Sequence, residues 1–317
     1  MKPAPENPTT TSDYDLRRRW LIPPVLWAAF GALCVLFQAW VFIRWAADGN
    51  LRGYPFSGEA PGYLKIGTRV LEGVAIIGCI LMIIACWRES RAAGHITLFA
   101  ALLAGYFLVI WTDPYSGTFM HTVSANLIGV NYPSWGPYLP GWQGPTPQAQ
   151  TLLEDLGYPW VVLWILIGLG IARLLTTRRP HWSPARVAVV TAVLVFPIDL
   201  VLEHAYMRFG GYGYPRALPY LTLFEGQWYQ LPLTSPICMT FLAVMPIVLM
   251  TVYARPGHEV WLLDGSLDLP RRAQPWIRLL AGIGFANLCM LSLQLVMLAA
   301  ASISYPIDLP PWYERPT

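Results

Sequence analysis

Long apolar segments recur along this chain of 317 residues, and they constrain its fold more than any other feature. A helix needs about 20 mainly apolar residues to cross a bilayer. Seven segments approach that length, and because the third and fourth are the shortest, a count of six or eight also fits. The sequence predicts an all-α, polytopic membrane bundle of about seven helices, at residues 21–46, 67–87, 95–111, 159–175, 184–202, 233–253 and 276–300.

Composition supports a membrane protein and excludes several other classes. Hydrophobic residues make up 55% of the chain and charged residues only 12%, whereas soluble domains carry roughly 25% charged residues. A net charge of +3 is too small for a nucleic-acid-binding face. The five cysteines lie in apolar runs without CxxC spacing, which is neither a disulfide framework nor a zinc site. We expect one membrane domain over 21–303, a disordered tail over 1–20 and a C-terminal tail over 304–317.

The basic residues divide unequally between the two sides of the predicted bundle. Lys and Arg near membrane spans favour the cytoplasmic side. With the N-terminus inside, that side receives fourteen of them and the other side seven. The bias predicts a cytoplasmic N-terminus and an outside C-terminus in the cell membrane.

The predicted outer loops are long and aromatic. They cover 47–66, 112–158 and 203–232, and they are rich in Gly, Pro, Trp and Tyr. Disordered segments lack aromatic residues, so these loops are expected to be ordered. An aromatic belt at the headgroup layer is one explanation. The dense Gly and Pro favour the other, a folded lid over a pocket.

Several ionisable residues fall near the outer ends of the spans, where such groups suggest function. Asp199 and Glu203 are four residues apart on one helical face, just after Pro197, which should kink the helix. Arg69 and Glu72 are three apart and positioned to pair. Neighbouring carboxyl groups in a dry pocket separate into an acid and a base. The candidate catalytic residues are Asp199, Glu203, Asp113, His204 and Glu72.

The alternative for these charged residues is purely structural. Ion pairs between helices could account for Asp199, Glu203, Arg208, Arg69 and Glu72, and Asp113, before a proline, could be a turn residue. The candidates for binding a substrate are aromatic or basic residues of the outer loops and helix ends: Tyr115, His121, Trp135, Trp142, Arg208, Tyr212, Tyr214 and Trp228.

Other catalytic classes lack their motifs in this sequence. The five histidines are isolated, and HExxH, GxSxG, P-loop and GxGxxG motifs are absent. A single Asp-xxx-Glu pair gives only a weak Mg²⁺ signal. We therefore expect acid–base chemistry without a metal or another cofactor.

Four segments give the chain a family resemblance. They are WTDPYSG at 111–117, NYPSWGPYLPGW at 131–142, PIDLVLEHAYMRFGGYGYP at 197–215 and YQLP at 229–232. In pattern and order the chain resembles the AveC-type spirocyclase family of polyketide biosynthesis. The resemblance implies an integral membrane cyclase/dehydratase that closes a dihydroxy-ketone into a spiroketal, and it carries over no catalytic residues.

The sequence leaves three functional hypotheses. The first is a membrane-embedded cyclase/dehydratase that acts on an apolar polyketide- or isoprenoid-like substrate. The second is a transporter or lipophile-binding membrane protein that uses the same pocket, although no internal repeat favours a transporter. The third is a structural subunit whose polar residues pair helices.

Overall fold

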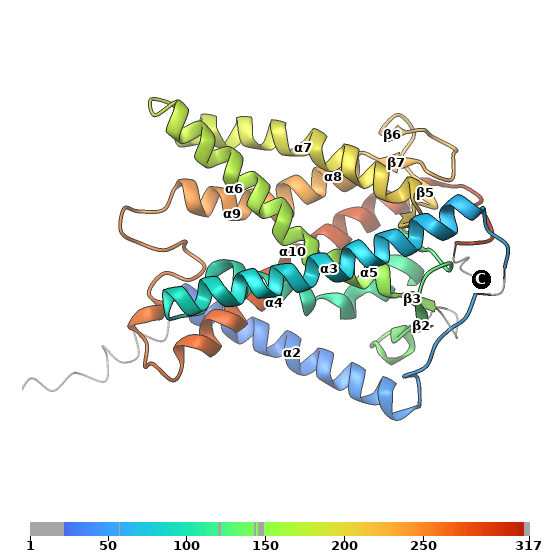
Figure 1. Cartoon of the computed structure of the whole chain (residues 1–317), viewed down its shortest axis with the longest axis horizontal. Coiled ribbons are helices and arrows are strands. Elements are labelled where there is room, and N and C mark those ends of the chain that lie inside the picture. Colours follow the sequence, from blue (N-terminus) through green and yellow to red (C-terminus); the bar gives the residue numbers. More distant parts are fainter. Residues whose placement is uncertain (1–21, 57, 120–121, 143, 145–148, 314–317) are drawn as a thin grey trace, which may run out of the picture.

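The computed structural model describes residues 22–56, 58–119, 122–142, 144 and 149–313. It is a bundle of long helices whose axes run roughly along one direction, with short strands gathered at one end (Figure 1). Six helical segments are long and apolar enough to cross a membrane. The chain is therefore an integral membrane protein. These segments are α2 (Pro23–Ala47), α3 (Gly62–Ala93), α5 to α6 (Leu152–Arg178), α7 (Pro184–Arg208), α8 to α9 (Thr234–Val252) and α10 (Gln274–Ser302).

The predicted third span, 95–111, is shorter and less regular than expected. Helix α4 covers only Leu98–Phe107 and continues as a short 3-10 turn, η1 (Ile110–Thr112). Irregular backbone at membrane depth is tolerated where protein groups satisfy it. On α10, Asn287 Nδ2 donates to the Leu108 carbonyl at 3.1 Å, and Gln294 Nε2 donates to Thr112 Oγ1 at 2.9 Å. The predicted count of seven long helices is thus not confirmed. The predicted third span is a short, broken segment that hydrogen bonds from α10 support.

Helix α10 packs closely against α2 and α4 through glycines. A Cβ atom on Gly284 would lie 2.3 Å from the Trp27 carbonyl oxygen of α2, and one on Gly282 would lie 2.3 Å from the Ala101 carbonyl oxygen of α4. Small residues of this kind let helix backbones approach closely in membranes. These contacts at Gly282 and Gly284, which we call the glycine seam, place α10 along one wall of the interior.

The remaining spans contain irregular turns near the strand-bearing end. The sixth span begins as α8 (Thr234–Cys238), passes through a π-helical turn, η5 (Met239–Val244), and ends as α9 (Met245–Val252). A second π turn, η2 (Tyr115–Phe119), follows α4. Such turns occur frequently at functional sites. The fifth span, predicted to end at residue 202, continues as α7 through Pro197 to Arg208.

The described parts of the outer loops pair with one another. Among the described residues four two-stranded sheets form, two of which join segments about 90 residues apart, and the C-terminal segment takes part in one of these two. Isolated pairing of Asn126 with Tyr313 adds a further link. The sheets join β1 (Ser124–Ala125) to β4 (Tyr212–Gly213), β2 (Asn131–Pro133) to β3 (Ala149–Thr151), β5 (Arg216–Ala217) to β8 (Tyr305–Pro306), and β6 (Thr222–Leu223) to β7 (Leu231–Pro232).

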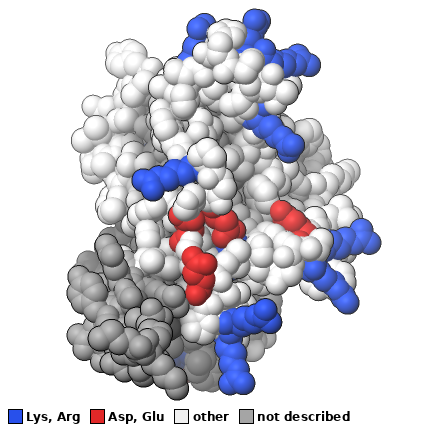
Figure 2. All heavy atoms as spheres, turned by 90° about the vertical axis from the view of Figure 1, so that its left-hand side faces the viewer, with Lys and Arg blue, Asp and Glu red and all other residues white. Residues whose placement is uncertain are grey.

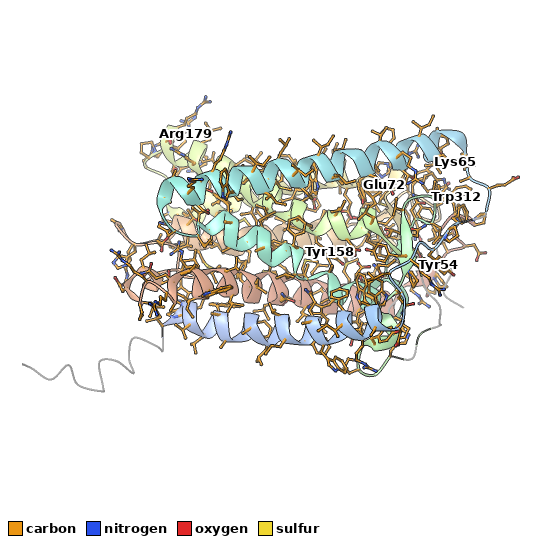
Figure 3. The ribbon with its side chains drawn as sticks, turned by 60° about the horizontal axis from the view of Figure 1, so that its bottom comes forward. Tyr54, Lys65, Glu72, Tyr158, Arg179 and Trp312 are labelled. Atoms are coloured by element: carbon orange, nitrogen blue, oxygen red, sulfur yellow. The ribbon has the colours of Figure 1, made fainter. Side chains whose placement is uncertain are left out.

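The end opposite the strands carries basic side chains. Lys and Arg side chains are spread around this face, and a few acidic ones lie nearer its centre (Figure 2). Figure 3 shows Arg179 at this end, Trp312 and Lys65 at the opposite end, and Tyr158 between them. The structure therefore separates a basic end from an end covered by loops.

Candidate active site

A cavity of about 440 Å³ lies below the outer loops, in the half of the bundle that carries the strands. Pockets for small molecules usually measure about 300–1,000 Å³. Its walls come from α3, from the α5–α6 segment, and from α7, η5 and α10. The lining is mainly apolar and aromatic, and it includes the carboxyl groups of Asp199, Glu203 and Glu154. The site thus combines an apolar container with a few acid groups.

Glu203 is held as a hydrogen-bond acceptor. Its Oε1 atom accepts from the hydroxyl of Tyr212 at 2.7 Å, from that of Tyr214 at 2.5 Å and from that of Ser235 at 2.7 Å. Hydrogen bonds from several donors stabilise a carboxylate. Among the described residues, Glu203 Oε2 has no hydrogen-bond partner although it is buried. One oxygen is therefore fixed by the protein, while the other is available to a group in the cavity.

A tight turn after α7 brings the two tyrosines over Glu203. Gly210 has φ = 89°, a conformation that favours glycine, and a Cβ there would lie 2.6 Å from Thr68 Oγ1. The turn reverses the chain so that β4 and Tyr214 return to the same helix. Burial and the neighbouring Glu203 raise the pKa of Tyr212 and of Tyr214 well above the ordinary value, so both remain proton donors near neutral pH.

Asp199 lies one turn of α7 before Glu203 and also lines the cavity. Its side chain is buried, with 3% of the residue surface exposed. Within the described part of the chain, its Oδ2 atom has no hydrogen-bond partner. A buried carboxyl group with few donors is more stable neutral than charged. The pair therefore offers two carboxyl groups in different surroundings on one helix face.

Tyr158 supplies a hydroxyl group on the wall formed by the α5–α6 segment. It donates to Asp113 Oδ1 at 2.5 Å, and Gln150 Nε2 donates to Asp113 Oδ2. Asp113 is 2% exposed and does not line the cavity itself. Burial raises the pKa of Asp113 to about 7, and the hydrogen bond from Tyr158 partly opposes that rise. The Asp113 carboxyl group is thus linked to the cavity through the Tyr158 hydroxyl.

A family model described as "Spirocyclase AveC-like" matches residues 70–315. The chain belongs to the AveC-like spirocyclase family. The matched range contains all the residues that line the cavity. Comparisons with curated proteins and with solved structures find no match.

In this member of the family, four of the predicted site residues line the cavity directly: Asp199, Glu203, Tyr212 and Tyr214. Glu72 pairs with Arg69 at 2.7 Å, as expected from their spacing. It also accepts from the Val130 backbone N–H at 2.6 Å. Glu72 therefore anchors an outer loop to α3 and does not line the cavity.

The other predicted residues lie outside the cavity lining. His204 stacks on Phe224, with ring centroids 4.6 Å apart, and the Arg208 guanidinium lies 4.1 Å from the centroid of the Tyr229 ring. His121 lies outside the described residues. Aromatic packing in the outer loops holds the remaining four, Tyr115, Trp135, Trp142 and Trp228.

Sequence reasoning missed Tyr158, Ser235 and Gln150. Tyr158 lies at the start of a predicted span, where a belt tyrosine is ordinary. Ser235 and Gln150 belong to segments without a charged residue of their own, so no local pattern distinguishes them. In the described part of the chain, no group of three or more His, Cys, Asp and Glu side chains is arranged to hold a metal ion.

Proposed function

We propose that this protein is a membrane-embedded cyclase/dehydratase that forms a spiroketal from an apolar, polyketide-like hydroxyketone by acid–base catalysis. Family membership supports a cyclase activity. The observation that carries the proposed mechanism is the pair of buried carboxyl groups, Asp199 and Glu203, on the wall of one apolar cavity.

The proposed chemistry divides the two proton transfers between these groups. Asp199, in its neutral form, protonates the hydroxyl of a hemiketal, which leaves as water and gives an oxocarbenium ion. The second substrate hydroxyl attacks that carbon, and Glu203 takes its proton through Oε2. One C–O bond breaks, one forms, and one water is lost. Glu203 keeps its negative charge through the donors on Oε1, and that charge stabilises the cation.

Tyr158 extends this scheme to the opposite wall. Its side chain lines the cavity, and its hydroxyl proton is directed to Asp113. Tyr158 is therefore placed to accept a hydrogen bond from a substrate hydroxyl and to orient that hydroxyl. Orientation of two hydroxyl groups toward one carbon is a large part of such a reaction. Exclusion of water by the apolar lining would favour the dehydrated product.

Location and orientation complete the proposal. The basic end of the bundle faces the cytoplasm, so the loops and the cavity face the outer leaflet of the cell membrane. The partners are the bilayer and an apolar small molecule.

Conversion of an open-chain dihydroxy-ketone by the purified protein tests the proposal, with loss of one water followed by mass spectrometry. We expect Glu203→Gln and Asp199→Asn each to lower the rate by about 10²–10⁴-fold, the usual contribution of a general acid or base. Tyr158→Phe should lower it less, because it orients the substrate. Glu225→Gln, at an exposed loop position, is the matched control and should leave the rate unchanged.

Two results would contradict this mechanism. Full activity of Glu203→Gln and Asp199→Asn would remove the carboxyl pair from the reaction. Binding of the hydroxyketone without any loss of water, in wild type and variants alike, would favour the second candidate, a lipophile-binding protein.

A further inference from the structure

The wall of the cavity between α3 and α7 is incomplete. At one end of this wall the two helices meet closely, because a Cβ on Gly67 of α3 would lie 2.6 Å from the Phe209 carbonyl oxygen. At the other end, Gly78 of α3 meets the start of α6, where its Cβ would lie 2.3 Å from the Trp160 ring. These contacts are about 16 Å apart along α3, at 1.5 Å per residue. Over their whole lengths, α3 packs chiefly on α4 and α5, and α7 packs chiefly on α6 and α9.

Residues that line the cavity reach the outside of the bundle in this interval. Val74 of α3 is 51% exposed, Leu202 of α7 is 47% exposed and Phe209 is 56% exposed, yet all three line the cavity. The lining residues on the loop side are covered instead: Tyr214 is 2% exposed and Thr122 is 3% exposed. The cavity therefore comes to the surface sideways, through a gap between α3 and α7 that we call the side window.

The surroundings of the side window are apolar. On α3 it is flanked by Val70 and Ile77, both exposed and within the apolar run of a membrane span. The charged residues at the start of α3 are Lys65, Arg69 and Glu72, at the outer end of the window, and the next charged residue along this helix is Arg88. The window thus opens onto lipid chains and not onto water.

The loops close the other approach among the described residues. Strand β4 pairs with β1 above the cavity, and Tyr212 and Tyr214 are bonded to Glu203 beneath them. The C-terminal segment lies over this pair, where the Leu127 N–H donates to the Trp312 carbonyl at 2.9 Å and Tyr313 is 1% exposed. A substrate entering from water would have to break these contacts.

We propose that the substrate enters the cavity laterally, from the outer leaflet of the membrane, through the side window between α3 and α7. This inference rests on the proposed function and names its substrate class: an uncharged, mainly apolar molecule that is already dissolved in the bilayer. A charged group is disfavoured at membrane depth, where the window lies. The acidic lining would further disfavour an anion. An apolar tail longer than the cavity can remain in the lipid while the reacting part is enclosed.

Photolabelling of the full chain tests the route independently of catalysis. The protein is placed in phosphatidylcholine/phosphatidylglycerol vesicles with a diazirine-bearing fatty alcohol dissolved in the bilayer, and adducts are mapped by peptide mass spectrometry. We expect adducts on the cavity face of α7, around Asp199 and Glu203. A sulfonated diazirine added to the water should leave that face unlabelled. Adducts on the lipid-facing side of α2 serve as the internal standard.

Bulky substitutions on the two edges of the window distinguish entry from simple lipid contact. Val74→Trp and Leu202→Trp should each abolish adducts on the cavity face while leaving those on α2. The matched controls are Ile80→Trp and Val201→Trp, on the same two helices at exposed positions outside the cavity lining. They should leave cavity labelling unchanged, and thermal unfolding in detergent checks that all four variants fold.

The outcomes separate this inference from the proposed chemistry. Cavity labelling that persists in both Val74→Trp and Leu202→Trp, or that comes equally from the aqueous probe, overturns lateral entry and leaves the acid–base proposal intact. Normal labelling of Glu203→Gln is expected, since that substitution does not touch the window. If Glu203→Gln then retains full water loss, the chemistry is wrong and the entry route stands.

Discussion

Asp113 shows how a single buried residue can shape a site that it does not enter. It lies at the end of a broken helix, with Tyr158 bonded to one oxygen and Gln150 to the other. Tyr158 lines the cavity, so the carboxyl group acts on the cavity only by fixing that hydroxyl. From the local sequence, Asp113 could be only a turn residue before a proline. Its two hydrogen-bond partners, which are distant in sequence, make it a positioning residue.

The buried state of Asp113 predicts a pH-dependent stability. Its pKa of about 7 in the folded protein lies above the ordinary 3.8, so the folded state keeps a proton that the unfolded state releases. The free energy of unfolding should therefore fall as the pH rises from about 4 to about 7, by at most about 1.4 kcal/mol per pH unit. Unfolding in detergent across this range measures it.

Asp113→Asn is the matched variant, because the amide keeps an acceptor oxygen for Tyr158. We expect a flatter pH profile than that of the wild type. The neighbouring Asp155 is also buried and interacts with Asp113, so the difference between the profiles reports Asp113 together with its interaction with Asp155. Two superimposable profiles would show that Asp113 does not change its protonation in this range.

Helix α10 is the element on which the interior is built. It contacts α2 and α4 through glycines and repairs the broken end of α4 with Asn287 and Gln294. It also lines the cavity with Met290, Leu293 and Met297. A substitution that disturbs the packing of α10 should therefore also disturb the cavity.

Gly284→Leu tests the glycine seam. A side chain there would collide with the Trp27 carbonyl, so we expect a loss of about 1–3 kcal/mol in the free energy of unfolding, typical of overpacking. The control is Gly170→Leu on α6, where a Cβ would meet nothing within 4 Å. Both substitutions replace glycine by leucine within a helix, so the gain in helix propensity is the same and cancels in the comparison. Equal stability of the two variants would contradict a tightly packed seam.

At the scale of the whole molecule, the two ends differ in both charge and architecture. Helix ends and basic side chains form one end, while paired strands, aromatic clusters and the C-terminal segment form the other. A cavity near the second end fits a reaction supplied from the outer leaflet. This asymmetry makes the orientation of the protein testable.

Cysteine labelling in intact cells measures that orientation. The five native cysteines are buried, so background should be low. We expect Tyr220→Cys, at a position 97% exposed in the outer loops, to react with an impermeant maleimide from outside. His181→Cys, in the exposed turn between α6 and α7, should react only after permeabilisation. The reverse pattern would invert the assignment.

Local patterns in the sequence determined the membrane class, most helix positions, the Arg69–Glu72 pair and the Asp199/Glu203 face of α7. Apolar length and the helical repeat are properties of consecutive residues, so they can be read without a fold. The same patterns overestimated the helical length of 95–111. Its end is broken and is supported by Asn287 and Gln294, which belong to a helix about 180 residues away in sequence.

Tertiary structure alone decided which polar and aromatic residues share a cavity. His204, Arg208, Trp135 and Trp228 have the right chemistry for a site, but loop packing turns them elsewhere. Tyr158 lines the cavity because the α5–α6 segment packs against α3. Helix α3 contacts α4 and α5 more than it contacts α7, which leaves the side window between α3 and α7. These are contacts between distant segments, set by packing of whole helices, and no local pattern encodes them.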